Sequence, residues 1–262
     1  MGMTVAEIRE MLRHANAEEF DALERSLAAD SRKGVRSAVE VARRRIESQQ
    51  AEAARIEGLY AFDASHVPEG VDGLVVGLDE VGRGAVAGPL AVGAVVLPPD
   101  SRIAGLNDSK QLTPDERERV ATDIKSQAVC WAVYYVEPDE IDSSGMSASL
   151  RKAFKGALAS IEDQGVLPQV VLVDGNPLGI DDREVNVVKG DAKSASIAAA
   201  SIVAKVTRDD LMRQLSEQFP PYGFFENKGY ASADHIQAIR DRGVSSVHRK
   251  TFCKSFMQEK LF

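Results

Sequence analysis

Short apolar runs with the length of buried strands recur after about residue 70, and they restrict the fold more than any other feature of this sequence. The first two runs follow each other closely, whereas segments with helical spacing of apolar residues separate the second run from the third and the third from the fourth. This order favours a mixed sheet flanked by helices, which is an α/β fold. We predict strands at residues 73–79, 90–97, 130–136, 170–174 and 184–188, and helices at about 114–127, 138–142, 146–164 and 193–217.

The first 66 residues have a different pattern, with apolar residues at helical spacing and charges of both signs on the other faces. The segments Thr4–Glu7 and Asn16–Glu19 each carry a capping-box signal for the start of a helix. Ser31 is expected to cap a longer helix that stops at Gly58. The basic run Arg43–Arg45 could contact a nucleic-acid backbone, but a solvated helix face is the favoured interpretation. We therefore predict a helical extension over residues 1–66 and a second domain, with C-terminal helices, over residues 67–262.

Composition and charge argue against several classes of protein. Hydrophobic residues make up 44% of the chain and charged residues 27%, which is ordinary for a globular protein. The formal net charge of -8 and the pI near 5.2 argue against a protein that coats DNA without regard to sequence, because such proteins are usually basic. No apolar run approaches the roughly 20 residues that span a bilayer, and no leader pattern opens the chain. The cysteines, Cys130 and Cys253, are expected to be reduced, and we expect a cytoplasmic monomer without membrane contact.

Two adjacent acids end the first predicted strand, where Asp79 and Glu80 precede Gly82, Arg83 and Gly84. Neighbouring residues of a strand point to opposite faces, so we expect a backbone turn, which the glycines permit, to bring the two carboxylates to one point. Carboxylates at a sheet edge suit hard cations such as Mg²⁺ or Mn²⁺. The arginine suits phosphate. For this segment alone, an acidic strand cap followed by a flexible turn is an equally good interpretation.

Two further acids lie where ligands gather in open α/β sheets. Asp174 closes an apolar strand, and Asp191 comes just before the longest predicted helix of the second domain. With Asp79 and Glu80 they could form a cluster of four carboxylates, which would repel one another unless divalent cations neutralised them. Two cations about 3.5–4 Å apart suit in-line hydrolysis of a phosphodiester. Taken singly, Asp174 and Asp191 would more often be a helix cap or a turn acid.

Six short motifs occur in order along the chain, and their joint occurrence is far more specific than any one of them. The motifs are Asp79–Gly84, Asn107–Lys110, Val173–Gly175, Lys189–Asp191, Ala199–Asp209 and Asn227–Tyr230. Through them, the segment of about residues 73–255 resembles bacterial ribonuclease HII. The resemblance implies a ribonuclease H-like fold, a mixed five-stranded sheet flanked by helices, here with an N-terminal helical extension.

The resemblance also implies an activity. Members of this family are endoribonucleases that require Mg²⁺ or Mn²⁺ and cut the RNA strand of RNA–DNA hybrids. They also cut on the 5′ side of a single ribonucleotide embedded in duplex DNA, and their products carry 3′-hydroxyl and 5′-phosphate ends. The implied substrates are RNA–DNA hybrids and ribonucleotide-containing duplex DNA, and the implied processes are ribonucleotide excision repair and DNA replication.

Roles for individual residues follow from the same resemblance. The residues that match the family's catalytic, metal-binding carboxylates are Asp79, Glu80, Asp174 and Asp191. The loop that reads the ribose 2′-hydroxyl, a group that only RNA carries, is matched by Gly82, Arg83 and Gly84. Tyr230 matches the tyrosine that stacks on the sugar at the junction from RNA to DNA.

Other polar residues are weaker candidates for contact with the substrate. Ser109 and Lys110 suit a phosphate, with a plain loop as the alternative. Lys193 and Ser194 lie near a helix N-terminus, which is a favourable place for phosphate. We interpret Arg208 with Asp209 as an ion pair of the scaffold. His235 and His248 could contact phosphate, but a packing or surface role is the favoured interpretation for both.

Three alternatives stay open on the sequence alone. A related nuclease of the same broad fold would cut branched DNA without any ribonucleotide. A non-catalytic binder of hybrid duplexes is disfavoured, because four carboxylates repel phosphate unless metals are present. The N-terminal helices could dock a replication or repair protein, which is compatible with catalysis. The extension does not resemble the sheet-containing N-terminal domain of ribonuclease HIII, and this favours HII.

Overall fold

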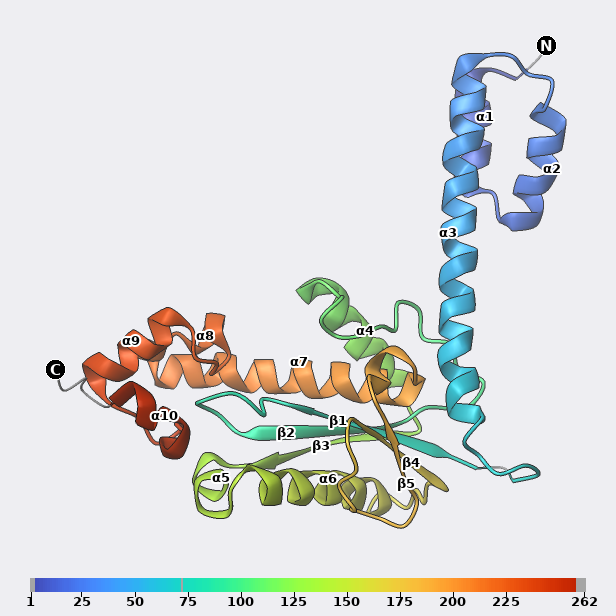
Figure 1. Cartoon of the computed structure of the whole chain (residues 1–262). Helices are drawn as coiled ribbons and strands as arrows, with labels where there is room; N and C mark the ends of the chain where they lie inside the picture. Colours follow the sequence, from blue (N-terminus) through green and yellow to red (C-terminus); the bar gives the residue numbers. More distant parts are fainter. Residues whose placement is uncertain (1–2, 72, 258–262) are drawn as a thin grey trace. The chain divides into compact units, whose positions relative to one another are not determined.

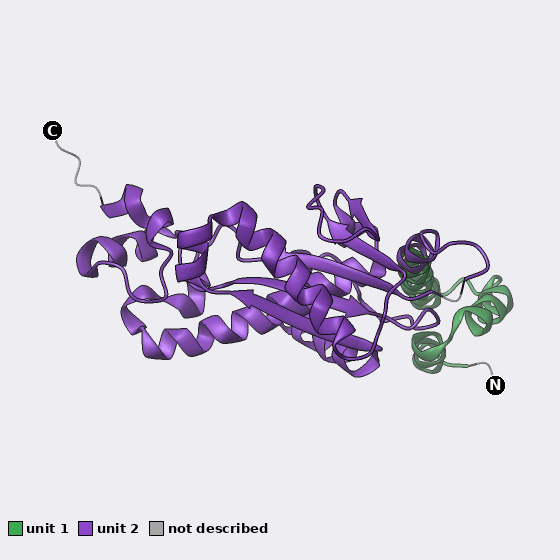
Figure 2. Cartoon of the chain, turned by 90° about the horizontal axis from the view of Figure 1, so that it is seen from below, with its two compact units in different colours: residues 1–57 green, residues 58–262 purple. Residues whose placement is uncertain are grey.

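The structure, a computed structural model, describes residues 3–71 and 73–257. It divides into two compact units, Met1–Glu57 and Gly58–Phe262, which Figure 2 shows in different colours. Each unit has a hydrophobic core of its own. The boundary between the units lies inside one long helix, and the predicted division into domains after residue 66 stays a prediction.

The first unit is made of helices, as the sequence predicts. Its elements are α1 (Val5–His14), α2 (Ala17–Leu27) and the first part of α3 (Lys33–Ala64). Both predicted capping boxes are present, because Thr4 and Asn16 each accept a hydrogen bond from the backbone N–H three residues later. The apolar cluster that holds the three helices together contains Ile8, Leu12, Phe20, Val35, Ala42 and Ile46.

The arginine run of α3 finds its partners inside the first unit. Arg43 and Arg44 form ion pairs with glutamates of α2 and α3. Arg45 donates hydrogen bonds to two backbone carbonyls at the end of α1, 2.6 and 3.2 Å away. These contacts support the interpretation of the run as a helix face that stabilises the unit.

Helix α3 continues past Gly58, so the predicted stop at that residue is wrong. The residues that follow the glycine make tertiary contacts: Leu59 and Tyr60 are buried, and the Tyr60 hydroxyl accepts hydrogen bonds from Ser101 and from the backbone N–H of Ile103. A glycine inside a helix costs only about 1 kcal/mol relative to alanine. Burial of the next turn in the second unit outweighs that cost.

The second unit is built on a mixed five-stranded sheet with the order β3-β2-β1-β4-β5 (Figure 1). The strands are β1 (Val75–Val81), β2 (Leu90–Val96), β3 (Cys130–Val136), β4 (Val170–Asp174) and β5 (Glu184–Val187). The first three pair antiparallel, whereas β4 runs parallel to β1 and β5 runs parallel to β4. The predicted α/β fold and its mixed sheet are confirmed.

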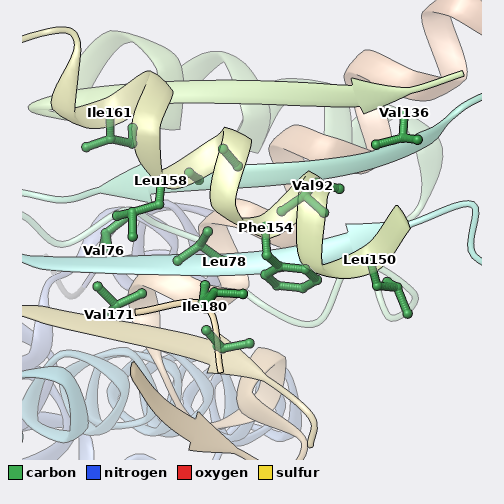
Figure 3. Close-up of a cluster of buried hydrophobic side chains, with 14 of the residues drawn as sticks. Val76, Leu78, Val92, Val136, Leu150, Phe154, Leu158, Ile161, Val171 and Ile180 are labelled. Carbon is green, nitrogen blue, oxygen red and sulfur yellow. The ribbon is translucent and has the colours of Figure 1, made fainter. Parts of the chain in front are cut away.

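Helices cover both faces of this sheet, with α6 on one side and α7 on the other (Figure 1). The α6 face holds the main core, where Phe154 of α6 packs with Leu78 of β1 and Val92 of β2 (Figure 3). The helices of the second unit are α4 (Pro114–Gln127), α5 (Pro138–Ser144), α6 (Met146–Glu162), α7 (Ala195–Gln218), α8 (Phe224–Asn227), α9 (Ala233–Arg242) and α10 (Lys250–Met257), with 3-10 turns η1 (Gly190–Ala192) and η2 (Pro220–Tyr222). No helix among the described residues is long and apolar enough to cross a membrane.

Two strand glycines let α7 lie directly against the sheet. A Cβ added at Gly77 would lie 2.1 Å from the backbone carbon of Ser196, and one added at Gly93 would lie 2.4 Å from the carbonyl oxygen of Ala200. Gly93 is also the register partner of Asp79 on β1. The close approach of α7 therefore sets the depth at which the β1 carboxylate meets the helix.

Replacing Gly93 with Ala is expected to lower the free energy of unfolding by about 2–3 kcal/mol, because the new methyl group meets helix backbone that cannot rotate away. The matched control is Gly58→Ala on α3, where nothing lies within 4 Å of the added Cβ. That control should raise stability by about 0.5–1 kcal/mol. Urea unfolding of both variants measures the difference, and equal stability of the two would contradict the packing described here.

Candidate active site

The two adjacent acids of β1 lie beside the end of β4. β1 is regular through Asp79 and Glu80, and the backbone turns only at Gly82, where φ is 82°. The expectation that a turn brings the two carboxylates to one point therefore needs correction, because they still leave opposite faces of the strand. They share a site for another reason: β4 ends at Asp174 and leaves the neighbouring end of β1 open.

All three acids line a hollow of about 360 Å³, which we call the acidic hollow. It opens between the ends of β1 and β4, the loop after β1, and the middle of α7. Its other polar lining residues are Arg83, Ser109, Lys110, Ser201, Lys205 and Tyr230, with Gly82 and Gly84 in the loop. The four predicted metal-binding acids are completed by Asp191, which interacts electrostatically with Asp79 and Asp174.

Burial and mutual repulsion make Asp79, Glu80 and Asp174 hard to ionise without a cation. Burial, together with the nearby charges of Asp174, Glu80 and Asp191, raises the pKa of Asp79 to about 8, against a hydrogen bond from Ser201. Burial is likewise the first cause that raises the pKa of Glu80 and of Asp174. A bound cation would reverse this balance, because it favours the ionised form of every acid around it.

Asp191 is fixed by the turn that precedes α7. It lies in η1 and is mostly buried, with only 8% of its surface exposed. The backbone N–H of Gly190 donates a 2.6 Å hydrogen bond to Oδ1 of Asp174, which ties this turn to the end of β4. The Nζ of Lys110 lies 3.5 Å from Oδ2 of Asp191. Residues far apart in sequence thus bring the fourth acid to the other three.

The donor chemistry of the cluster fits a hard divalent cation. All four side chains are carboxylates, and oxygen ligands are those that Mg²⁺ and Mn²⁺ prefer. As the side chains stand, no three Asp, Glu, His or Cys residues within 3–71 and 73–257 are grouped so that they could hold a metal ion. The acids are neighbours at the strand ends, and a cation would lower the raised pKa values of Asp79, Glu80 and Asp174.

Cations and one aromatic ring border the acidic hollow on its open side. The side chain of Arg83 is 62% exposed and lies 3.4 Å from a carboxylate oxygen of Glu80. Tyr230 is 39% exposed, and the guanidinium of Arg208 lies 5.8 Å from its ring centroid. Lys205 lines the same hollow from α7. Positive and aromatic groups next to a buried acid cluster suit a phosphodiester with its sugar.

Two buried arginines hold the loop that follows β1. Arg208 donates to the carbonyls of Pro89, Lys228 and Ala87, and Arg249 donates to those of Gly88 and Arg83. Neither guanidinium is exposed to solvent. The interpretation of Arg208 and Asp209 as an ion pair is wrong, because Asp209 pairs with Lys205 instead, at 2.8 Å. Arg208 is a scaffold residue through its carbonyl contacts.

Two of the weaker candidates for phosphate contact, Ser194 and Ser109, are buried in the structure. Ser194 is fully buried, and its hydroxyl caps α7 and donates to Asp63, so the predicted phosphate contact there needs correction. Lys193 next to it is exposed. Ser109 lines the acidic hollow, but it is buried and shares a 3.1 Å hydrogen bond with Ser201. Lys110 is exposed at the rim, where a phosphate contact stays open to it.

His235 and His248 form a buried pair below the tyrosine. Their Nε2 atoms are 3.1 Å apart, and both rings are fully buried. Nδ1 of His235 lies 2.8 Å from the carbonyl oxygen of Tyr230, so this nitrogen donates and fixes the tautomer. Burial lowers the pKa of both rings, to about 4 for His248. They are packing residues that hold the Tyr230 backbone, as the favoured interpretation has it.

Sequence reasoning missed Ser201 and Lys205 as residues of the site, and treated them only as part of a helix. Both lie on one stripe of α7 with Ser194, at spacings of seven and four residues. That helical spacing was readable in the sequence. Asn176 was also missed: it lines a second, smaller hollow of about 210 Å³ together with Glu80 and Asp174.

Comparisons with known proteins agree over most of the chain. Residues 76–255 match the family described as ribonuclease HII, and residues 4–66 match the ribonuclease HII N-terminal domain. A ribonuclease HII of Levilactobacillus brevis is 42% identical over 227 residues, which are 87% of this chain and 86% of that protein. A ribonuclease HII of Bacillus cereus is 39% identical over 250 residues, 95% of each chain.

Solved structures share the fold of the second unit. The ribonuclease H2 of Pyrococcus horikoshii has a TM-score of 0.59 and 29% identity, covering 71% of this chain and all of that one. The ribonuclease HII of Archaeoglobus fulgidus, solved in complex with PCNA, has a TM-score of 0.60 and 26% identity, covering 71% of this chain and 98% of that one. Both structures match 71% of this chain and almost all of their own chains. This is the result expected if the present chain has an N-terminal extension that these two proteins lack.

Proposed function

Because this chain belongs to the ribonuclease HII family, we propose that the acidic hollow is the active site of an endoribonuclease that hydrolyses the RNA strand of RNA–DNA hybrids. The single observation that carries this assignment is the meeting of Asp79, Glu80 and Asp174 in one hollow, with Asp191 tied beside it. A ribonuclease H is a hydrolase, so water is the other substrate. The products would carry 3′-hydroxyl and 5′-phosphate ends.

We propose that Asp79, Glu80, Asp174 and Asp191 together hold two Mg²⁺ or Mn²⁺ ions. When bound, such ions activate water and stabilise the leaving oxygen in phosphodiester hydrolysis. The chain's own residues hold the ions, offset the repulsion among the carboxylates and bind the substrate phosphate. The four carboxylates supply the negative donors, and Lys110, 3.5 Å from Asp191, offsets part of their repulsion. The exposed Arg83 is free to turn from Glu80 to a substrate phosphate.

Recognition of RNA is proposed for the loop Gly82–Gly84 and for Tyr230. A Cβ at Gly84 would meet nothing within 4 Å, so backbone groups there are open to a ligand. The tyrosine borders the same hollow and is held from below by its backbone contact to His235. A 2′-hydroxyl that meets this loop, followed by a deoxyribose under the ring, would mark the junction from RNA to DNA.

Replacing Tyr230 with Ala is expected to lower cleavage at a single ribonucleotide in duplex DNA by about 10- to 100-fold, since stacking on one base or sugar is worth about 1–3 kcal/mol. Cleavage inside a long RNA–DNA hybrid should fall less, because its RNA offers many sites. Tyr135→Phe, which keeps a ring on β3 away from the acidic hollow, is the matched control. Equal loss on both substrates would remove Tyr230 from junction recognition.

Cleavage mapping tests the proposed function directly. The full chain would be incubated with a long RNA–DNA hybrid, a DNA duplex carrying one ribonucleotide, and an all-DNA duplex, in Mg²⁺, in Mn²⁺ or in EDTA. We expect metal-dependent cuts in the hybrid and immediately 5′ of the single ribonucleotide, and an intact all-DNA duplex. Cleavage of branched DNA without ribonucleotides would favour the alternative nuclease, and binding of hybrids without any cut would favour the non-catalytic binder.

A replication or repair partner is a further part of the proposal. The relative from Archaeoglobus fulgidus was solved in complex with PCNA, which supports a partner of that kind for this chain. The N-terminal helices are the proposed docking element, and a monomer is the proposed state of the free chain. Sedimentation of the full chain alone and with a replication clamp tests both. The expected cytoplasmic location stays a prediction.

A further inference from the structure

Asp63, near the end of α3, is a buried carboxylate whose side-chain hydrogen bonds all come from the start of α7. Its Oδ1 accepts a hydrogen bond from the hydroxyl of Ser194. Its Oδ2 accepts two more, from the backbone N–H and the hydroxyl of Ser196, each 2.8 Å long. Only 8% of Asp63 is exposed, and the two serines are buried. Three donors on one carboxylate make up for its burial and give the contact a defined geometry.

The turn η1, just before these serines, carries a metal-binding acid of the proposed site, Asp191. The backbone N–H of Ser194 donates to the carbonyl of Gly190, 2.8 Å away, which closes the turn that holds Asp191. At its other end the same turn is tied to Asp174 through the N–H of Gly190. The turn that presents Asp191 is thus fixed at one end by the catalytic carboxylate Asp174 and at the other end by Asp63.

We propose that Asp63 is a positioning residue that sets the metal affinity of the active site by fixing the start of α7 behind Asp191. It acts through Ser194 and Ser196 and touches no substrate. The inference rests on the proposed function, because it needs the four carboxylates to hold metal. It also gives the N-terminal family domain a role, since Asp63 lies within the matched residues 4–66 while both serines lie within the matched residues 76–255.

Metal binding without substrate is the first measurement. The full-length Asp63→Ala and Asp63→Asn variants would be titrated with Mn²⁺, and free Mn²⁺ followed by electron paramagnetic resonance. Loss of a group that orients metal ligands typically weakens metal affinity by about 10- to 100-fold, and we expect that range here. Asp163→Asn, an exposed acid after α6, is the matched control and should bind Mn²⁺ like the unmodified chain.

Kinetics add a second readout that loss of stability alone would not produce. In Asp63→Ala, the Mg²⁺ concentration for half-maximal cleavage of the hybrid should rise by the same factor as the Mn²⁺ dissociation constant. The KM for the hybrid at saturating Mg²⁺ should stay unchanged, because Asp63 lines no part of the acidic hollow. A raised KM with unchanged metal dependence would overturn the proposed role.

Chemical rescue sharpens the test. Asp63 borders a separate hollow of about 520 Å³ with Tyr60, Val67, Leu74 and Ser196, so a small carboxylate can enter beside the serines once the side chain is removed. Formate should therefore restore part of the metal affinity of Asp63→Ala. It should not help Asp63→Asn, in which the amide still fills the place of the carboxylate. Equal effects of formate on both variants would count against a specific carboxylate contact.

Failure of this inference is distinguishable from failure of the proposed function. If the unmodified chain cleaves hybrids and the Asp63 variants bind Mn²⁺ normally, only the positioning role falls. If the unmodified chain binds no Mn²⁺ and cuts no hybrid, both fall. Should Asp63→Ala not fold, Ser196→Ala removes only one of the three donors and is expected to weaken Mn²⁺ binding in the same direction by a smaller factor. Unchanged binding in a folded Ser196→Ala, together with normal binding in Asp63→Asn, would overturn the role.

Discussion

Replacing Asp79 with Asn will reduce cleavage of an RNA–DNA hybrid by at least about 1,000-fold, equivalent to about 4 kcal/mol of transition-state stabilisation. Asp79 is the more buried of the two acids of β1. It faces α7 and lines the acidic hollow together with Glu80 and Asp174. An amide has nearly the same shape but carries no charge to hold a divalent cation. Single-turnover cleavage in saturating Mg²⁺ measures the loss.

The same variant should fold at least as well as the unmodified chain, which separates a catalytic role from a structural one. Burial, with repulsion from the neighbouring acids, raises the pKa of Asp79 to about 8. The unfolded chain releases this proton near pH 4, so the folded state binds more protons between about pH 4 and pH 8. The free energy of unfolding contributed by this group therefore falls as the pH rises through that window. In EDTA, Asp79→Asn should flatten that decline.

Asp163→Asn is the control for Asp79→Asn, because it makes the same chemical change at an exposed position and should leave both cleavage and stability unaltered. Retained metal-dependent cleavage by Asp79→Asn would remove this residue from the proposed active site. A folded but inactive variant that is less stable than the unmodified chain at pH 8 in EDTA would instead show that the carboxylate is not strained by its surroundings.

Replacing Arg208 with Lys will lower the free energy of unfolding by about 4 kcal/mol, although the charge is kept. The guanidinium bonds three carbonyl oxygens, of Ala87, Pro89 and Lys228, and is fully buried. A lysine amine lacks the planar fork and would leave about two of these carbonyls without a donor, at about 1–3 kcal/mol each. Urea unfolding measures the loss.

The rate of hybrid cleavage by Arg208→Lys should also fall, even at urea concentrations below the midpoint of its unfolding. The reason is that Arg208 joins the loop after β1 to the segment that leads to Tyr230. Arg213→Lys, five residues further along α7, is the matched control. Its guanidinium is partly exposed and forms ion pairs with Glu118 and Asp210, so the change should cost less than about 0.5 kcal/mol. Similar costs for the two variants would show that the buried carbonyl contacts contribute little.

Much of the fold could be predicted from the sequence, because the local sequence patterns and the tertiary structure favour the same helices and strands. The short apolar runs and the capping signals at Thr4 and Asn16 are local, and they place strands and helix starts close to where the structure has them. The stop predicted at Gly58 failed, because helix α3 is extended by burial of Leu59 and Tyr60 in the second unit. That burial depends on residues more than 40 positions away in the sequence.

The residues of the proposed site also divide into those that the sequence identified and those that only the tertiary structure could place. By itself the sequence determined the acids, the glycine loop and the tyrosine, since each lies in a short motif whose chemistry is legible residue by residue. Only the tertiary structure decided which side chains face the acidic hollow. Ser194, predicted to contact phosphate, turns inward to Asp63, whereas Lys205 on the same helix stripe lines the hollow. Which surroundings each side chain of a helix stripe faces is set by the elements that pack against that part of the helix. This packing depends on contacts between residues distant in sequence, which no local pattern contains.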